Sequence, residues 1–241
     1  MIRAITFDLD DTIWPIEPVI QRANQLMLQW LQHHAPAFTQ RFDITGVNAL
    51  RDEVIAREPK LCHNLNWVRQ ALLSLGLRRC GYQAGQAEKL AMQAFEIFFA
   101  ARNQVSLFEQ VTPILHELQQ HYILGTLSNG NADLKCIGLD HLFDFSFNSA
   151  DVGHSKPNPA MFNAALNHTG LQSQQVVHVG DHPEHDMLGA RQLGMHCIWM
   201  NPTLQDWPGL QRPNAEIHAF TELPAAVSKL RQSVTDNFER L

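Results

Sequence analysis

Short apolar segments that stop at polar clusters alternate along the chain with longer segments whose apolar residues recur at helical spacing. The first apolar segment, Ile2 to Phe7, runs into the polar sequence Asp8-Leu9-Asp10-Asp11-Thr12. This pattern predicts a buried strand that opens into a loop. Four more segments are predicted to be strands: Tyr122 to Leu127, Phe143 to Phe147, Gln175 to Val179 and His196 to Met200.

From about Glu17 to Asn103 the chain shows only helical patterns. The first predicted helix has Pro18 near its start, and the second is expected to end at Gly76, a common C-terminal signal. The apolar faces that define three helices are Val19, Ile20, Ala23, Met27, Trp30 and Leu31; Leu65, Val68, Leu72 and Leu75; and Ala87, Leu90, Ala91, Ala94, Phe95 and Phe98.

Beyond Thr112-Pro113, a predicted helix start, strand and helix patterns alternate regularly, and a last helix is expected from Glu222. This alternation predicts an α/β fold with a doubly wound parallel sheet. We therefore expect a core domain of residues 1–16 and 104–241, interrupted by a helical domain of residues 17–103.

Polar residues follow several of the predicted strands, and right-handed crossovers would bring these strand ends to one edge of the sheet. Asp8 and Asp10 are two residues apart, so in an extended segment both carboxylates face the same side. Two carboxylates at such a short distance repel one another unless a cation or a proton lies between them. A site made only of oxygen ligands favours Mg²⁺. The residues expected at this edge are Asp8, Asp10, Thr12, Ser128, Asn129, Lys156, Asp181 and Asp186.

Composition narrows the functional classes. The 241 residues are 45% apolar and 17% charged, which is typical of a globular protein. A net charge of -6 without a basic stripe gives no expectation of nucleic-acid binding. No apolar run is long enough for a membrane helix, and no signal peptide is evident, so we expect a cytoplasmic protein without a membrane partner. The sequence marks no oligomeric interface.

Four ordered motifs give the chain a family resemblance. Phe7-Asp8-Leu9-Asp10-Asp11-Thr12, Leu127-Ser128-Asn129, Lys156-Pro157, and Gly180-Asp181 with Asp186 are similar, in this order, to the four motifs of the haloacid dehalogenase superfamily. The resemblance covers Met1 to about Trp14 and about Thr112 to Asn201. It implies a Rossmann-like core with an α-helical cap inserted after the first motif.

The resemblance also implies a chemistry. Asp8 would attack phosphorus and form an aspartyl-phosphate, while Asp10 would act as general acid and then as general base. Mg²⁺ would be held by Asp8, Asp181 and the backbone carbonyl of Asp10, with Asp186 orienting the surroundings of the metal. The residues expected to bind phosphate are Thr12, Ser128, Asn129 and Lys156, with Thr12 also holding the first-motif loop in place.

Some residues permit two interpretations. His178, His182 and His185 surround Asp181 and suggest a zinc or iron site, but strand alternation should turn His178 away from Asp181, and we favour no histidine-metal site. Trp14 either stacks on a substrate ring or packs at the hinge. In the cap, Trp67 is a candidate for specificity or for the core, and His63 is a candidate specificity contact.

The resulting prediction is a Mg²⁺-dependent phosphomonoester hydrolase acting on a small phosphorylated metabolite. Asp8 to Trp14 and a helical cap of this length resemble bacterial phosphatases of flavin metabolism, which favours flavin mononucleotide (FMN) or 5-amino-6-(5-phosphoribitylamino)uracil as substrate. The alternatives are a sugar- or nucleotide-phosphate phosphatase, a phosphomutase and a 2-haloacid dehalogenase. Dehalogenases do not normally carry aspartate at the position of Asp10, and a non-catalytic binding module is disfavoured by the full set of acidic residues.

Overall fold

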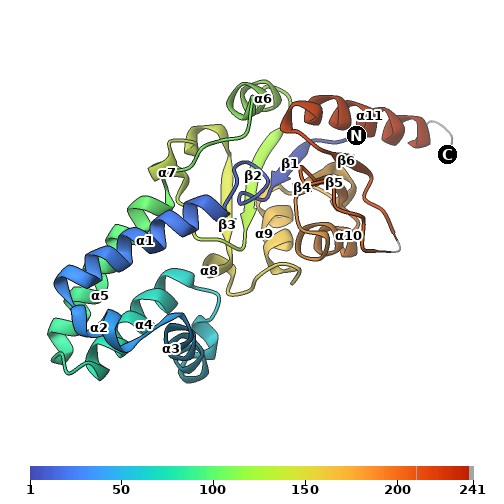
Figure 1. Cartoon of the computed structure of the whole chain (residues 1–241). Coiled ribbons are helices and arrows are strands. Elements are labelled where there is room, and N and C mark those ends of the chain that lie inside the picture. Colours follow the sequence, from blue (N-terminus) through green and yellow to red (C-terminus); the bar gives the residue numbers. More distant parts are fainter. Residues whose placement is uncertain (210, 239–241) are drawn as a thin grey trace. The chain divides into compact units, whose positions relative to one another are not determined.

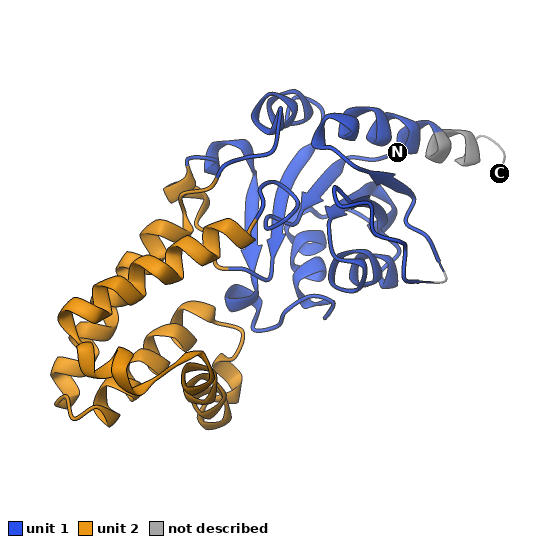
Figure 2. Cartoon of the chain, viewed as in Figure 1, with its two compact units in different colours: residues 1–15, 106–130, 138–241 blue, residues 16–105, 131–137 orange. Residues whose placement is uncertain are grey.

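The computed structural model describes residues 1–209 and 211–238 and divides into two compact units (Figure 2). The core unit comprises residues 1–15, 106–130 and 138–241, and the helical unit comprises residues 16–105 and 131–137. The segment 131–137, which the sequence analysis assigns to the core, groups with the helical unit. No helix in the described part of the chain combines the length and the apolar character that a membrane span requires.

The core unit is built on a parallel sheet, which confirms the predicted α/β class (Figure 1). Within the described residues the sheet has six strands in the order β3-β2-β1-β4-β5-β6, and every neighbouring pair is parallel. The last strand was not predicted, because three residues are too few to show a pattern. The strands are β1 (Ala4–Phe7), β2 (Ile123–Ser128), β3 (Phe145–Asn148), β4 (Val176–Gly180), β5 (His196–Met200) and β6 (Ala215–Ile217).

Helices pack on both faces of this sheet, as the doubly wound pattern requires. On one face Ala4 of β1 joins a buried cluster with Met161 and Phe162. On the other face the ring of Phe7 contacts those of Phe143 and Phe220, at centroid distances of 6.1 and 6.2 Å. The helical elements of the core unit are α6 (Val111–Leu118), η2 (Asp140–Leu142), α8 (Ser149–Val152), α9 (Ala160–Thr169), η3 (Ser173–Gln175), the π-helix η4 (Pro183–Leu188), α10 (Gly189–Gln192), η5 (Phe220–Glu222) and α11 (Leu223–Phe238).

In its described residues the helical unit contains no strand, in agreement with the sequence pattern. The prediction that a helix ends at Gly76 is wrong, because α4 continues to Arg79. A side chain at Gly76 would lie 2.4 Å from the ring of Phe38 and 2.9 Å from Leu50, so glycine permits close packing here. The elements are α1 (Glu17–His34), α2 (Pro36–Arg41), α3 (Ile44–Arg57), η1 (Pro59–Leu61), α4 (Leu65–Arg79), α5 (Ala84–Arg102) and α7 (Leu134–Ile137).

Candidate active site

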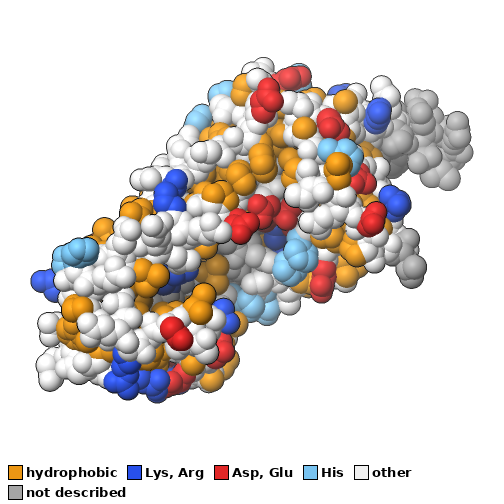
Figure 3. All heavy atoms as spheres, viewed as in Figure 1, with side chains coloured by type: hydrophobic (Ala, Val, Ile, Leu, Met, Phe, Trp, Pro, Cys, Tyr) orange, Lys and Arg blue, Asp and Glu red, His pale blue; other side chains and the backbone are white. Residues whose placement is uncertain are grey.

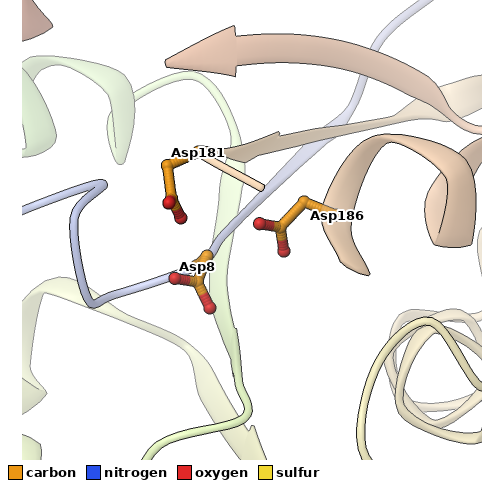
Figure 4. Close-up of side chains that lie close together, drawn as sticks. All are labelled: Asp8, Asp181 and Asp186. Atoms are coloured by element: carbon orange, nitrogen blue, oxygen red, sulfur yellow. The ribbon is translucent and has the colours of Figure 1, made fainter. Parts of the chain in front are cut away.

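Three buried or half-buried carboxylates meet at the carboxyl edge of the core sheet. Asp8 follows β1 and Asp181 follows β4, and these neighbouring strands lie where the strand order reverses direction. Such a switch point is the usual ligand site of a doubly wound sheet. Figure 4 shows the side chains of Asp8, Asp181 and Asp186 close together, and one oxygen of each lies within 4.8 Å of the others.

A buried lysine neutralises part of this charge. The Lys156 ammonium donates hydrogen bonds to Asp8 Oδ1 at 2.6 Å and to Asp186 Oδ1 at 2.5 Å. The backbone of Lys156 is held by Asn129, whose Oδ1 accepts from the Lys156 N–H at 2.7 Å and whose Nδ2 donates to the Lys156 carbonyl at 3.0 Å. The Asn129 side chain therefore fixes the backbone of Lys156, from which the ammonium reaches both carboxylates.

Burial and mutual repulsion shift the pKa values of these groups. Burial, with the negative charges of Asp186 and Asp181, raises the pKa of Asp8 well above its ordinary value, against the opposing effect of Lys156. Burial, with Asp186 and Asp11, raises the pKa of Asp181 to about 7. Burial acts to lower the pKa of Lys156, but Asp186 and Asp8 raise it to about 12. The ammonium is thus charged, and one positive charge faces three carboxyl groups.

This donor set fits a divalent metal ion. Three carboxyl groups with oxygens within 4.8 Å carry more negative charge than Lys156 can balance. Burial is the main cause of the raised pKa of Asp181, and the negative charges of Asp186 and Asp11 add to it, so a bound cation would favour the ionised form. Carboxylate oxygens are hard ligands that suit Mg²⁺. Both oxygens of Asp186 already accept hydrogen bonds, Oδ1 from Lys156 and Oδ2 from the His182 N–H, whereas Lys156 contacts only Oδ1 of Asp8. Asp8 and Asp181 are therefore the better-placed ligands.

The loop after β1 presents Asp10 in a defined orientation. Asp10 and Trp14 form an isolated β-bridge, and Asp11, with a left-handed φ of 59°, donates its N–H to the Trp14 carbonyl at 2.7 Å. The Trp14 ring is fully buried, and its indole N–H donates to Asp10 Oδ1 at 2.8 Å. Of the two interpretations of Trp14, the structure favours packing, with an added hydrogen bond to Asp10 that the sequence analysis did not foresee.

The predicted phosphate-binding residues occupy different positions. Ser128 and Asn129 line the same pocket as Asp8, although the Asn129 amide is engaged with the Lys156 backbone, and Ser128 Oγ accepts from the Gly130 N–H at 3.0 Å. Thr12 is fully buried, and its hydroxyl lies 3.5 Å from Asp181 Oδ1. Its location agrees with support of the loop, and direct contact of Thr12 or of the Asn129 side chain with phosphate stays a prediction.

Asp186 lies within the π-helix η4 and lines the pocket. Its Oδ2 accepts from the His182 backbone N–H at 3.0 Å, and its Oδ1 accepts from Lys156. A side chain at Gly180 would lie 2.4 Å from the Asp186 Cγ, so glycine at the end of β4 is what lets this carboxyl group approach the sheet. Burial acts to raise the pKa of Asp186, but Lys156 and His178 hold it below its ordinary value.

The histidines differ in their environments. His182 and His185 line the pocket, their rings stack at 3.8 Å, and His182 Nδ1 accepts from the His185 N–H at 3.1 Å. His178 is fully buried, and its Nε2 lies 3.1 Å from Asp186 Oδ1. Strand alternation relates His178 only to Asp181 and does not predict this contact with Asp186. A polar residue inside an otherwise apolar strand was the available signal, because a buried imidazole needs partners.

The pocket around these carboxyl groups is small, at about 160 Å³. It is lined by Asp8, Asp10, Asp11, Ser128, Asn129, Gly130, Lys156, Asp181, His182, His185 and Asp186. On the face seen in Figure 3, acidic side chains gather beside histidine side chains. A cavity of this size has room for a compact group such as a phosphoryl group rather than for an organic ring. Because carboxyl groups outnumber the single ammonium, an anion in this pocket would need a further cation beside it.

The helical unit has a larger cavity of its own, of about 590 Å³, between α1, α3, α4 and α5. Its walls are mostly apolar, and Arg69 supplies a guanidinium that lies 3.5 Å from the centroid of the Phe98 ring. Arg69 donates to Asn24 Oδ1 at 3.1 Å, and burial lowers its pKa to about 10. Trp67 packs against the core of the helical unit and is not part of the cavity wall.

Residues 2–194 match the family of haloacid dehalogenase-like hydrolases. The chain is 29% identical over 230 residues to the 5-amino-6-(5-phospho-D-ribitylamino)uracil phosphatase YigB of Escherichia coli K12, covering 94% of this chain and 96% of that protein. It is 33% identical over 129 residues to a phosphoserine phosphatase of Thermus thermophilus, covering 51% and 52%. The crystal structure of a 2-haloacid dehalogenase from Pseudomonas syringae pv. Tomato DC3000 superposes with a TM-score of 0.92, at 37% identity, covering 95% of this chain and 99% of that one.

Proposed function

The chain belongs to the haloacid dehalogenase-like hydrolase family, and from that premise we propose that it hydrolyses phosphomonoesters through an aspartyl-phosphate on Asp8. The observation that carries the proposal is the position of Asp8 at the end of β1, with the Lys156 ammonium 2.6 Å from its Oδ1 and the carboxyl groups of Asp181 and Asp186 beside it. A carboxylate nucleophile needs a neighbouring positive charge when a phosphate dianion approaches, and this arrangement supplies one.

In the first step, an oxygen of Asp8 forms a bond to phosphorus, and the bond from phosphorus to the ester oxygen breaks. Asp10, held by the Trp14 indole, gives its proton to the departing alkoxide. In the second step, Asp10 takes a proton from water, whose oxygen attacks the phosphorus of the aspartyl-phosphate. Asp8 is thereby regenerated and inorganic phosphate leaves. Lys156 stabilises the charge on the transferring group throughout.

Asp8 and Asp181 would hold Mg²⁺, with the backbone carbonyl of Asp10 as a third ligand and Asp186 orienting its surroundings. When bound, the ion supplies positive charge that offsets repulsion between the acidic groups and the phosphate. The excess of carboxyl groups over ammonium groups is the feature of this chain that supports such a role.

We further propose that the substrate is a small phosphorylated metabolite, with FMN or 5-amino-6-(5-phosphoribitylamino)uracil preferred. Two observations support this preference. YigB, which is named for the second of these substrates, aligns with 94% of this chain and along 96% of its own length. The cavity of the helical unit has mostly apolar walls and is also lined by Arg51 and Arg69, and a flat ring with carbonyl oxygens has complementary chemistry.

A 2-haloacid dehalogenase is the second candidate, favoured by the 37% identity to the Pseudomonas structure of that name. Such an enzyme also forms an ester on an aspartate, but halide is a leaving group that needs no proton. The acid role that we propose for Asp10 would then have no purpose, although Asp10 lines the pocket and its carboxyl group accepts a hydrogen bond from the Trp14 indole. Phosphate release therefore remains the better-supported reaction.

A panel of substrates separates these functions. FMN, 5-amino-6-(5-phosphoribitylamino)uracil, sugar phosphates, nucleotides and 2-chloropropionate are incubated with the wild type, with MgCl₂ or EDTA, and released phosphate and chloride are measured. We expect Mg²⁺-dependent phosphate release, and a loss of several orders of magnitude in Asp8→Asn with folding retained. Chloride release without phosphate release would overturn the proposal. Phosphate release only in the presence of a sugar bisphosphate would indicate a phosphomutase.

A further inference from the structure

A buried chain of hydrogen bonds lies behind the carboxyl groups, inside the sheet. Thr6 of β1 and His178 of β4 are register partners in neighbouring strands, and both are fully buried. The Thr6 hydroxyl lies 2.9 Å from His178 Nδ1, and His178 Nε2 lies 3.1 Å from Asp186 Oδ1. The edge of the His178 ring packs on Phe162 at a centroid distance of 5.2 Å and an interplanar angle of 89°. The imidazole is therefore confined by partners on both nitrogens and on its side.

The two contacts specify one tautomer of the ring. Burial lowers the pKa of His178, which favours the neutral imidazole with one N–H. The pKa of Asp186 is held below its ordinary value by Lys156 and His178, so its carboxylate only accepts hydrogen bonds. The proton must then lie on Nε2, facing Asp186, and Nδ1 accepts from the Thr6 hydroxyl. The alternative partner of that hydroxyl, the Val177 carbonyl, is more distant at 3.5 Å.

The orientation of the Asp186 carboxylate in turn determines the position of the Lys156 ammonium. One oxygen, Oδ1, accepts from both His178 and Lys156, and the same ammonium reaches Asp8 Oδ1 at 2.6 Å. The other oxygen of Asp186 is fixed by the His182 backbone N–H. Asp186 thus has three donors. Two of them, the His178 ring in the sheet and the His182 backbone N–H, are rigid, whereas the third, the Lys156 side chain, is long and flexible. The rigid donors therefore determine where the carboxylate, and with it the ammonium, comes to rest.

We propose that His178, held in one tautomer by Thr6, is a positioning residue that orients Asp186 and thereby places the Lys156 ammonium against the nucleophile Asp8. The inference rests on the proposed function only for its kinetic consequence. Outer partners of this kind commonly contribute about 10- to 100-fold to activity. Because a well-placed ammonium stabilises the transferring phosphoryl group most strongly in the transition state, the loss should fall on kcat more than on KM.

The experiment compares His178→Met, which removes both nitrogens at similar volume, with His178→Gln, whose amide can donate from a place near Nε2. The substrate is p-nitrophenyl phosphate with Mg²⁺, and kcat is corrected for the folded fraction. We expect a kcat about 10- to 100-fold lower in His178→Met, recovery to within about fivefold in His178→Gln, and KM within about threefold throughout. Thr6→Val removes only the hydroxyl, and we expect a smaller loss of kcat with normal folding.

A readout independent of turnover is the ¹⁵N spectrum of the histidine-labelled full chain. We expect a proton on Nε2 of His178 in the wild type and a shift toward the other tautomer in Thr6→Val. Equal kcat in wild type and His178→Met, or a His178 proton on Nδ1, would overturn the proposal. If wild type released no phosphate at all, the proposed function would fail, and the spectrum would still decide the positioning of the ring.

Discussion

At the scale of single residues, identical carboxyl groups acquire different chemistry from their donors. Asp8 receives the Lys156 ammonium, Asp10 receives the Trp14 indole, and Asp186 receives Lys156, His178 and a backbone N–H. Ion pairing and several donors favour the ionised form of Asp186, which accordingly has a low pKa. The partners of each group therefore support an assignment of nucleophile, acid and anchor that residue type alone does not give.

Trp14→Phe tests the role of the indole N–H on Asp10. Without this donor at 2.8 Å, Asp10 loses the bond that orients its proton, while the aromatic packing is largely kept. General acid catalysis matters for a poor alkoxide leaving group and little for p-nitrophenolate. We expect kcat/KM for FMN or another alkyl phosphate to fall about tenfold or more, and the value for p-nitrophenyl phosphate to fall by less than about threefold.

Trp67→Phe is the matched control, because Trp67 packs in the helical unit and does not line the core pocket. Melting temperatures of both variants are measured beside the kinetics. If Trp14→Phe lowered kcat/KM equally for alkyl phosphates and for p-nitrophenyl phosphate, the indole would have only a packing role and the prediction would be wrong.

At the scale of elements, the sequence predicted what depends on local pattern. The five longer strands of the sheet were located to within about two residues, because buried strands are short apolar runs bounded by polar residues. The contact of His178 with Asp186 was missed, because alternation describes one strand and Asp186 belongs to the following turn η4. The end of α4 was misplaced, because Gly76 faces Phe38 of another helix, and no local signal reports that approach.

Gly76→Ala tests the packing explanation for this glycine. Alanine favours a helix by about 1 kcal/mol over glycine, so helix propensity alone predicts a more stable protein. The added methyl would lie 2.4 Å from Phe38, however, and overpacking costs about 1–3 kcal/mol. We expect a lower free energy of unfolding of the helical unit, measured by urea denaturation followed by circular dichroism. Gly85→Ala in α5, where a Cβ meets no atom within 4 Å, serves as control and should not destabilise. An equal gain in both variants would contradict the explanation.

At the scale of the whole molecule, chain topology gathers a site from distant segments. Asp8 and Asp181 are far apart in sequence, but the order β3-β2-β1-β4-β5-β6 makes their strands neighbours. The four motifs and the predicted βαβ pattern were therefore sufficient to anticipate this gathering. They could not anticipate the cavity of the helical unit, because its walls come from helices whose pairing depends on tertiary packing. Substrate preference, which we assign to that unit, is accordingly less predictable than the reaction.

Thermal unfolding as a function of pH and Mg²⁺ tests the charge balance of the site. The pKa of Asp181 in the folded chain is about 7, above the ordinary value of 3.8, so the folded state binds more protons between these two pH values. Its contribution to stability is complete below about pH 4 and is lost as the pH rises through 7. The raised pKa of Asp8 acts in the same direction.

A divalent cation competes with that proton, so bound Mg²⁺ should restore the stability that deprotonation removes. We expect the rise in melting temperature on replacing EDTA by MgCl₂ to be larger at about pH 8 than at about pH 5.5, since the carboxyl group that would ligate the ion is protonated at the lower pH. Asp181→Asn removes the titrating group, and its melting temperature in EDTA should depend less on pH across this window, with a smaller Mg²⁺ effect. A Mg²⁺ effect of equal size at both pH values in the wild type would show that the cluster of Asp8, Asp181 and Asp186 does not bind the ion in competition with protons.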